Sequence, residues 1–351
     1  MSPTAKTTLR ALALTLLAIA ATFGLDPFRN YQLAVAAGCF AAVAGLTVLV
    51  GLTGQLSLGH AVLMAAGGYG YAIAATAAAE ALPESLAESG VIPLLAGLAG
   101  AALAAGVLGL LLGLAAARLR GPYLAGLTLA LVIALPSAAN VIPALSGHQG
   151  RSAPFFGVPD ALSALIVVEQ WHAWLAIVVA AVAVTPLVVL RGGRAGLRMR
   201  SVLGDETAAR LAGVDPRRVK TGAFTASALS AGLGGAVLAI ATQSVSPGAY
   251  GLGFSLLLVV AAVVGGLGSI GGAAAGSALV VVLPWLVDQL TSALPAGFGQ
   301  RLNGTLAVLL FGVVVIAVTA AWPGGLAHLR HRLPWPARTA EPPVPVQNTE
   351  R

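Results

Sequence analysis

The stretch VIPLLAGLAGAALAAGVLGLLLGLAAA, residues 91–117, decides the fold class. It contains no charged residue, and it exceeds the roughly 20 apolar residues that a helix needs to cross a bilayer. The runs 60–79 and 221–243 are also free of Asp, Glu, Lys and Arg. Three such runs in one chain predict a polytopic membrane protein.

The composition agrees with this interpretation. Of the 351 residues 58% are hydrophobic and only 9% are charged, whereas soluble chains carry about 25% charged residues. These values exclude an ordinary soluble enzyme and a disordered chain, and the single Cys39 excludes a disulfide-rich scaffold. The 44 glycines and the low aromatic content favour closely packed helices over an outer-membrane barrel. The expected fold class is an all-α, polytopic transmembrane helical bundle.

About ten membrane segments are expected along the chain. They are 11–25, 33–52, 60–79, 91–117, 122–145, 173–190, 221–243, 253–267, 272–287 and 304–322. The first follows Lys6 and Arg10 and is interpreted as a membrane anchor, with a cleaved signal peptide as the alternative. Residues 1–333 are expected to form the transmembrane domain, and the proline-containing residues 334–351 a disordered cytoplasmic tail.

The distribution of basic residues predicts the topology. Residues 253–287 could form one long helix or two limbs around a glycine-rich break. With two limbs, both termini lie on one side, which holds every Lys and Arg except Arg29, Arg151 and Arg301. Because loops rich in Lys and Arg remain in the cytoplasm, two limbs and cytoplasmic termini are preferred. The net charge of +7 thus serves orientation in the lipid bilayer, and no nucleic-acid partner is expected.

Several kinds of chemistry have no sequence signature here. The chain has only two lysines, Lys6 and Lys220, and neither follows a phosphate-binding glycine loop. No Cys/His cluster has the spacing of a zinc site. A non-catalytic chain with no cofactor, no metal and no catalytic residue is therefore expected. The apolar spans also have almost no ionisable side chain, which weakens the alternative of a stand-alone ion-coupled or passive transporter.

The polar segment 191–220 is expected to lie in the cytoplasm and to be folded. Ser201 could cap a short helix over 202–212, on which Glu206 and Arg210 could form an i,i+4 ion pair. Gly213 suits a left-handed helix end, and Asp215-Pro216 suits the start of the next helix. Such a rigid helix could transmit force from a partner protein into the membrane. The alternative is a basic loop that only orients the chain.

Four stretches resemble known transporters. Residues 206–213, ETAARLAG, resemble the EAA-type coupling segment of ATP-binding cassette (ABC) importer permeases, although Thr207 separates the glutamate from the alanine pair. Residues 51–60 (GLTGQLSLGH), 118–125 (RLRGPYLA) and 263–272 (VVGGLGSIGG) resemble the LivM-type permeases of branched-chain amino acid importers. Together the four stretches extend over most of the chain, in the family's order.

The resemblance implies a permease subunit of an inner-membrane ABC importer for branched-chain or other hydrophobic amino acids. Its implied partners are a LivH-like second permease, two ATP-binding cassette ATPases that hydrolyse the ATP, and an extracytoplasmic solute-binding protein. Urea, short amides or another small solute remain alternative substrates. The implied ATPase-coupling residues are Asp205, Glu206, Ala208, Ala209, Arg210 and Gly213.

Candidate residues of the substrate path come from glycine and polar side chains in or between the spans. Helix ends, amides and hydroxyls can hold a zwitterion without charged side chains, and irregular backbone is tolerated where it lines a cavity. The candidates are Gly54, Gln55, Ser57, His60, Asn140, Gly265 and Gly268. The alternatives are a tight cytoplasmic turn for 54–60 and simple helix packing for 265–272.

Overall fold

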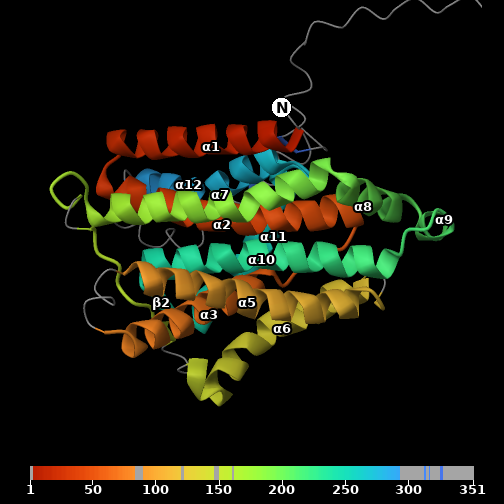
Figure 1. The fold of residues 1–351 in the computed structure, drawn as a ribbon, viewed down its shortest axis with the longest axis horizontal. Coiled ribbons are helices and arrows are strands. Elements are labelled where there is room, and N and C mark those ends of the chain that lie inside the picture. The colour runs from red at the N-terminus through yellow and green to blue at the C-terminus, as the bar shows by residue number, and fades with distance from the viewer. Residues whose placement is uncertain are drawn as a thin grey trace, which may run out of the picture.

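A computed structural model describes residues 3–83, 90–119, 122–145, 150–159 and 162–292, with a few isolated positions between 312 and 326. The described chain is an all-α bundle (Figure 1). Its α-helices are α1 (Pro3–Ala21), α2 (Pro27–Thr53), α3 (His60–Ala81), α5 (Val91–Ala116), α6 (Pro122–Val141), α7 (Val168–Gly192), α8 (Arg194–Gly204), α9 (Glu206–Leu211), α10 (Pro216–Thr242), α11 (Leu252–Gly265) and α12 (Ile270–Ser292). Short 3-10 turns are η1 (Thr22–Gly24), η2 (Pro143–Leu145) and η4 (Pro247–Tyr250).

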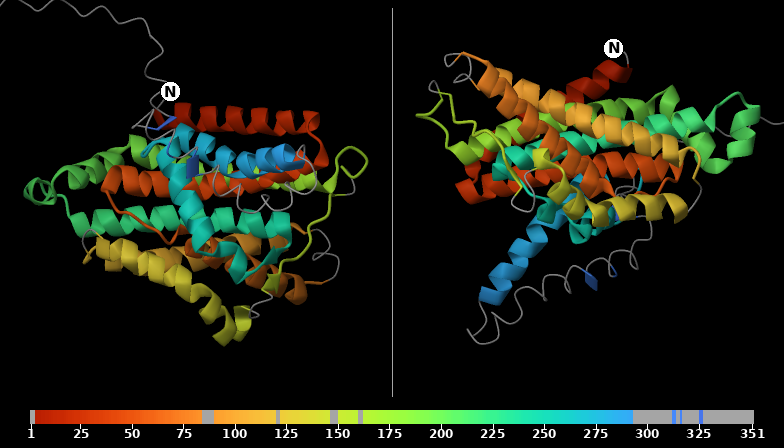
Figure 2. Two further views of the ribbon diagram at one scale, coloured as in Figure 1. Left: turned by 180° about the vertical axis from the view of Figure 1, so that it is seen from behind. Right: turned by 90° about the horizontal axis from the view of Figure 1, so that it is seen from below.

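The long helices run side by side, with α10 in the middle of the bundle (Figures 1 and 2). α10 packs against α2, α3, α5 and α7, whereas α1 lies at one edge and contacts mainly α7. Small residues allow these approaches: a Cβ atom added at Gly67 of α3 would overlap the Gly232 carbonyl of α10. Close contact between small residues is the usual way in which membrane helices associate.

Seven of the described helices are long and apolar enough to cross a membrane. They are α1, α2, α3, α5, α6, α7 and α10, and they match the first seven expected segments. Residues 253–287 form two helices, as preferred from the charge pattern, because Gly266 and Gly268 adopt positive φ values of 103° and 80° that break the helix. The expected segment 304–322 lies almost entirely outside the described residues, and the tail 334–351 lies wholly outside them.

A small antiparallel sheet lies at one end of the bundle. β1 (Arg151–Ser152) pairs with β2 (Ser244–Val245) and fastens the loop after α6 to the end of α10. The opposite end carries α8 and α9, and α9 projects beyond the long helices (Figure 1). The start of α1, the end of α5 and the start of α6 lie toward the α9 end of the bundle (Figures 1 and 2). Among the described residues, the basic segments at the start of α1 and in 191–220 thus lie at one end of the bundle.

Candidate functional site

The short helix α9 has defined capping at both ends. Asp205 is its N-cap, and the carboxylate accepts hydrogen bonds from the backbone N–H groups of Thr207 (2.6 Å) and Ala208 (3.2 Å). At the other end Gly213 has a φ of 79° and donates to the Arg210 carbonyl at 2.9 Å. A further bond from Val214 to the Ala209 carbonyl completes a Schellman motif (2.9 Å). These bonds hold a six-residue helix that could not persist alone.

The predicted single helix over 202–212 is wrong in one respect. α8 continues to Gly204, so Ser201 lies inside a helix and its hydroxyl donates to the Arg198 carbonyl at 2.8 Å. The break falls at Asp205, whose φ of −155° and ψ of 116° are extended. Asp205 can cap from this position because its carboxylate reaches two free N–H groups of the next helix. The left-handed Gly213 and the Asp215-Pro216 helix start are confirmed.

α9 is fastened to the bundle by charge. Glu206 forms the predicted ion pair with Arg210, at 3.6 Å. It also accepts a hydrogen bond from the ammonium group of Lys220 in the first turns of α10. The Lys220 side chain is only 11% exposed, whereas that of Arg210 is 53% exposed. The contact with Lys220 is therefore the sheltered one, and sequence reasoning did not single Lys220 out.

The outer face of α9 is open. Ala209 is buried against the protein, while Ala208 and Arg210 are exposed and Leu211 is 87% exposed. The helix α9 itself projects beyond the ends of the long helices (Figure 2). It can therefore be approached by another protein without displacing any described part of the bundle.

The second site is the irregular segment between α2 and α3. Gly54 ends α2 in the left-handed conformation with a φ of 68°, and residues 55–59 are not helical. The segment runs inward, because its end at His60 contacts Ser227, which lies about 16 Å along α10 from Pro216. α10 is about 40 Å long in total. The segment therefore enters toward the middle of the bundle, which favours a re-entrant path over a tight surface turn.

Hydroxyl groups from two neighbouring helices satisfy this irregular backbone. Thr128 of α6 accepts a hydrogen bond from the Leu58 N–H at 3.0 Å. Ser255 of α11 donates to the Leu58 carbonyl and accepts from the Ala61 N–H. A Cβ atom at Gly59 would lie 2.6 Å from the Thr128 carbonyl, so only glycine fits there. Non-helical backbone inside a membrane protein requires such internal partners.

His60 is the centre of a buried polar chain. Its Nδ1 lies 3.0 Å from the Ser57 hydroxyl and its Nε2 lies 2.8 Å from the Ser227 hydroxyl of α10. All three residues are fully or almost fully buried. The structure therefore brings the candidates Ser57 and His60 into contact, and it adds Ser227, which the sequence does not distinguish from Ser230 in the same helix.

Gln55 is the polar residue of this segment without a partner. It is 5% exposed, and neither its amide nitrogen nor its amide oxygen has a hydrogen-bond partner in the structure. A buried unpaired amide costs stability. The structure therefore leaves the hydrogen-bonding capacity of this amide unused.

The other candidates lie elsewhere. Gly265 ends α11, and a Cβ atom there would overlap the Gly272 carbonyl of α12. Gly268 donates to the Thr47 carbonyl of α2 at 3.1 Å and lies against Gly51. Both glycines thus bring helices together. Asn140 is exposed in the last turn of α6, about 18 Å along that helix from Thr128, so it does not join the 54–60 segment.

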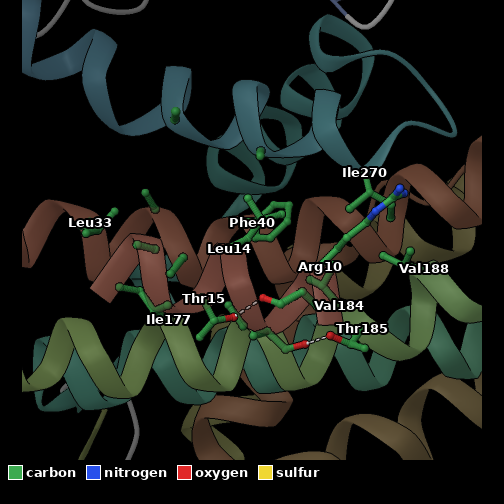
Figure 3. A pocket seen from close by; sticks show the side chains of 18 of the residues that line it. Arg10, Leu14, Thr15, Leu33, Phe40, Ile177, Val184, Thr185, Val188 and Ile270 are labelled. Carbon is green, nitrogen blue, oxygen red and sulfur yellow. Dashed lines mark hydrogen bonds between the residues drawn. The ribbon is translucent and has the colours of Figure 1, made fainter. Parts of the chain in front are cut away.

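The large groove between α1, α2, α7 and α12 has a different character (Figure 3). Its volume is about 530 Å³, and its walls are mostly aliphatic. The hydroxyls of Thr15 and Thr185 donate hydrogen bonds within their own helices, to the carbonyls of Ala11 and Ala181 respectively (Figure 3). Arg10 is the charged residue among the lining side chains. A zwitterion would find few free polar groups in this groove, so it is not assigned to the substrate path.

The fold and these sites define a multi-pass helical membrane protein with a buried re-entrant segment and a projecting short helix. Residues 29–319 match the family described as "Branched-chain amino acid transport system / permease component". The chain belongs to this family, and it is a multi-pass protein of the inner membrane.

Two curated relatives are similar to the chain. They are the high-affinity branched-chain amino acid transport system permease proteins LivM of Escherichia coli and of Salmonella typhimurium. Each is 29% identical over 250 residues, which cover 64% of this chain and 55% of the relative. The chain thus spans about half the length of these relatives. No solved structure matches it.

Proposed function

We propose that this chain is the membrane-spanning permease subunit of an ABC importer that moves branched-chain or other hydrophobic amino acids across the cytoplasmic membrane. Family membership supports the class of machine, and the names of the LivM relatives support the substrate. The chain has no catalytic role in this proposal. ATP hydrolysis belongs to its partners.

The observation that carries the proposal is α9. A six-residue helix capped at both ends, held by a sheltered lysine and open on its outer face, suits docking of another protein. A loop that only oriented the chain would need its positive charges but not this capping. Asp205, Glu206, Ala208, Ala209, Arg210 and Gly213 are proposed to form the contact with an ATPase subunit.

The proposed assembly contains four kinds of protein. A LivH-like second permease would pair with this chain, and two ATPase subunits would dock at the α9 end. An extracytoplasmic solute-binding protein would deliver the substrate to the opposite end. The basic residues at the α9 end support a cytoplasmic position for that end and for the N-terminus, and the charge pattern of the sequence supports the same side for the C-terminus.

The proposed substrate path follows the 54–60 segment. The unpaired Gln55 amide offers both a donor and an acceptor, and the end of α2 at Gly54 lies beside it. Together they could hold the carboxylate and ammonium groups of an amino acid without a charged side chain. Ser57 and His60 would position this segment, whereas Gly265 and Gly268 would support it through helix packing.

The test is uptake by purified components in proteoliposomes. The chain is reconstituted with the second permease, ATPases and binding protein encoded beside it, and uptake of labelled leucine is measured with and without ATP. We expect uptake only with ATP and the complete set. Uptake by this chain alone would contradict the proposal. Uptake of urea or a short amide, without uptake of leucine, would contradict the proposed amino acid substrate.

A further inference from the structure

Lys220 is the link between α9 and the interior of the bundle. It lies on α10, not on the short helix, yet its ammonium group binds Glu206 at the start of α9. Only 11% of its side chain is exposed. A sheltered ion pair is screened less by solvent and salt than a surface pair. A displacement of α9 therefore acts on α10 directly.

α10 is held too tightly to absorb such a displacement by bending. A Cβ atom at Gly45 of α2 would lie 2.7 Å from the Ser227 carbonyl, and one at Gly235 of α10 would overlap the Met64 carbonyl of α3. The Thr221 hydroxyl also donates to the Gly113 carbonyl of α5, at 3.0 Å. Contacts between backbones leave little room for local repacking. α10 should therefore move as a rigid body.

The inner end of this connection is the re-entrant segment. Ser227 follows Lys220 by two helical turns and so lies on nearly the same face of α10. Its hydroxyl contacts His60 Nε2, and His60 Nδ1 contacts Ser57 within the segment. The distance along α10 from Lys220 to Ser227 is about 10 Å.

We infer that Lys220 and Ser227 are positioning residues that carry the displacement of α9 through α10 to the 54–60 segment. Lys220 receives it from Glu206, and Ser227 passes it to His60. The transmission of ATPase motion by this connection rests on the proposed function. The ion pair between Glu206 and Lys220, called the clamp below, does not depend on the proposed function, because both residues lie in this chain.

The clamp is tested on the purified chain in lipid nanodiscs by amide hydrogen exchange. Lys220→Met removes the ammonium group and leaves Glu206 with its Arg210 partner. We expect exchange in residues 206–211 to rise by at least about fivefold. Arg218→Gln is the matched control, since its pair with Asp215 is exposed and should leave exchange in α9 unchanged. Unchanged exchange in Lys220→Met would overturn the clamp.

The transmission is tested in the assembled transporter. Leu56, which is 42% exposed, is replaced by cysteine in a Cys39→Ala background, and its rate of maleimide labelling is measured with and without a non-hydrolysable ATP analogue. We expect the nucleotide to change this rate by at least about threefold. Lys220→Met and Ser227→Ala should each abolish the change while the ATPase stays bound.

Ser230→Ala is the control for the inner contact. Ser230 lies on the same helix, but its hydroxyl donates to the Ala41 carbonyl of α2 at 2.6 Å and not to His60. The nucleotide response should survive this change. A response that persists in Lys220→Met and Ser227→Ala, or that is absent from the parent protein, would overturn the inference. Failure of any ATPase to copurify would instead contradict the proposed function.

Discussion

At the scale of single residues, small side chains and hydroxyls do most of the positioning. Gly67 permits α3 to approach α10, and Gly59 permits the re-entrant segment to approach α6. Thr128 and Ser255 supply the hydrogen bonds that the segment lacks. Because water is absent from the bilayer core, each of these contacts replaces one that a soluble protein could take from solvent.

The glycine contacts predict opposite results for two Gly→Ala changes. Gly67→Ala should lower the free energy of unfolding by about 1–3 kcal/mol, because its Cβ atom would overlap the backbone of α10. Gly222→Ala adds the same methyl group to a helix position with open space, and should raise stability by up to about 1 kcal/mol. Thermal unfolding in one detergent compares the two variants. Equal effects would contradict the proposed helix contact.

Replacing the unpaired amide of Gln55 distinguishes a role in substrate binding from a role in protein stability. Gln55→Leu removes a buried polar group without hydrogen bonds, so the melting temperature should stay the same or rise. If the amide binds substrate, leucine uptake by the assembled transporter should fall at least about tenfold. Normal uptake with a raised melting temperature would show that Gln55 is not on the path.

At the scale of elements, the caps decide how α8, α9 and α10 are separated. Asp205 starts α9, Gly213 ends it, and Asp215 starts α10. The expected boundary at Ser201 was misplaced because serine and aspartate both cap helices, and the local sequence does not rank them. The end of α9 at Gly213 and the start of α10 at Asp215-Pro216 could be predicted from the sequence. Glycine is favoured in the left-handed conformation after a helix, and proline is favoured at the first position of one.

The cap at Asp205 gives a prediction of its own. Asp205→Ala should destabilise α9 by about 1 kcal/mol, because two backbone N–H groups lose their acceptor. Hydrogen exchange in residues 206–211 should rise accordingly. Asp205→Asn keeps an acceptor oxygen and is the control. Equal exchange in the two variants would contradict the capping role.

The turn between α11 and α12 tests the proposed topology. Leu267 on this turn is 48% exposed, and Leu211 on α9 is 87% exposed. In a Cys39→Ala background, cysteines at these two positions should react with an impermeant reagent from the cytoplasmic side. Phe155→Cys, near the β1–β2 end, should react from the other side. Labelling of Leu267→Cys and Leu211→Cys from opposite sides would exclude the two-limb topology.

At the scale of the whole molecule, the fold class and the long helices were predictable because bilayer thickness fixes the length of an apolar run. The break at Gly266–Ser269 was also predictable, from the positive-inside rule. The contact between His60 and Ser227 was not, because the two residues are 167 positions apart and α10 also carries Ser230 and three threonines. The burial of Lys220 was not predictable either, because it depends on where α9 folds back onto α10.

The central claim is that α9 couples the motion of the ATPase subunits to transport by this permease. The most direct measurement is leucine uptake per ATP hydrolysed by the reconstituted transporter, with the native chain and with Gly213→Val. Valine at a φ of 79° is strained and should disorder the end of α9 without touching the membrane helices. The account predicts that uptake per ATP falls at least about tenfold while membrane insertion is unchanged. Unchanged uptake per ATP in Gly213→Val would contradict it.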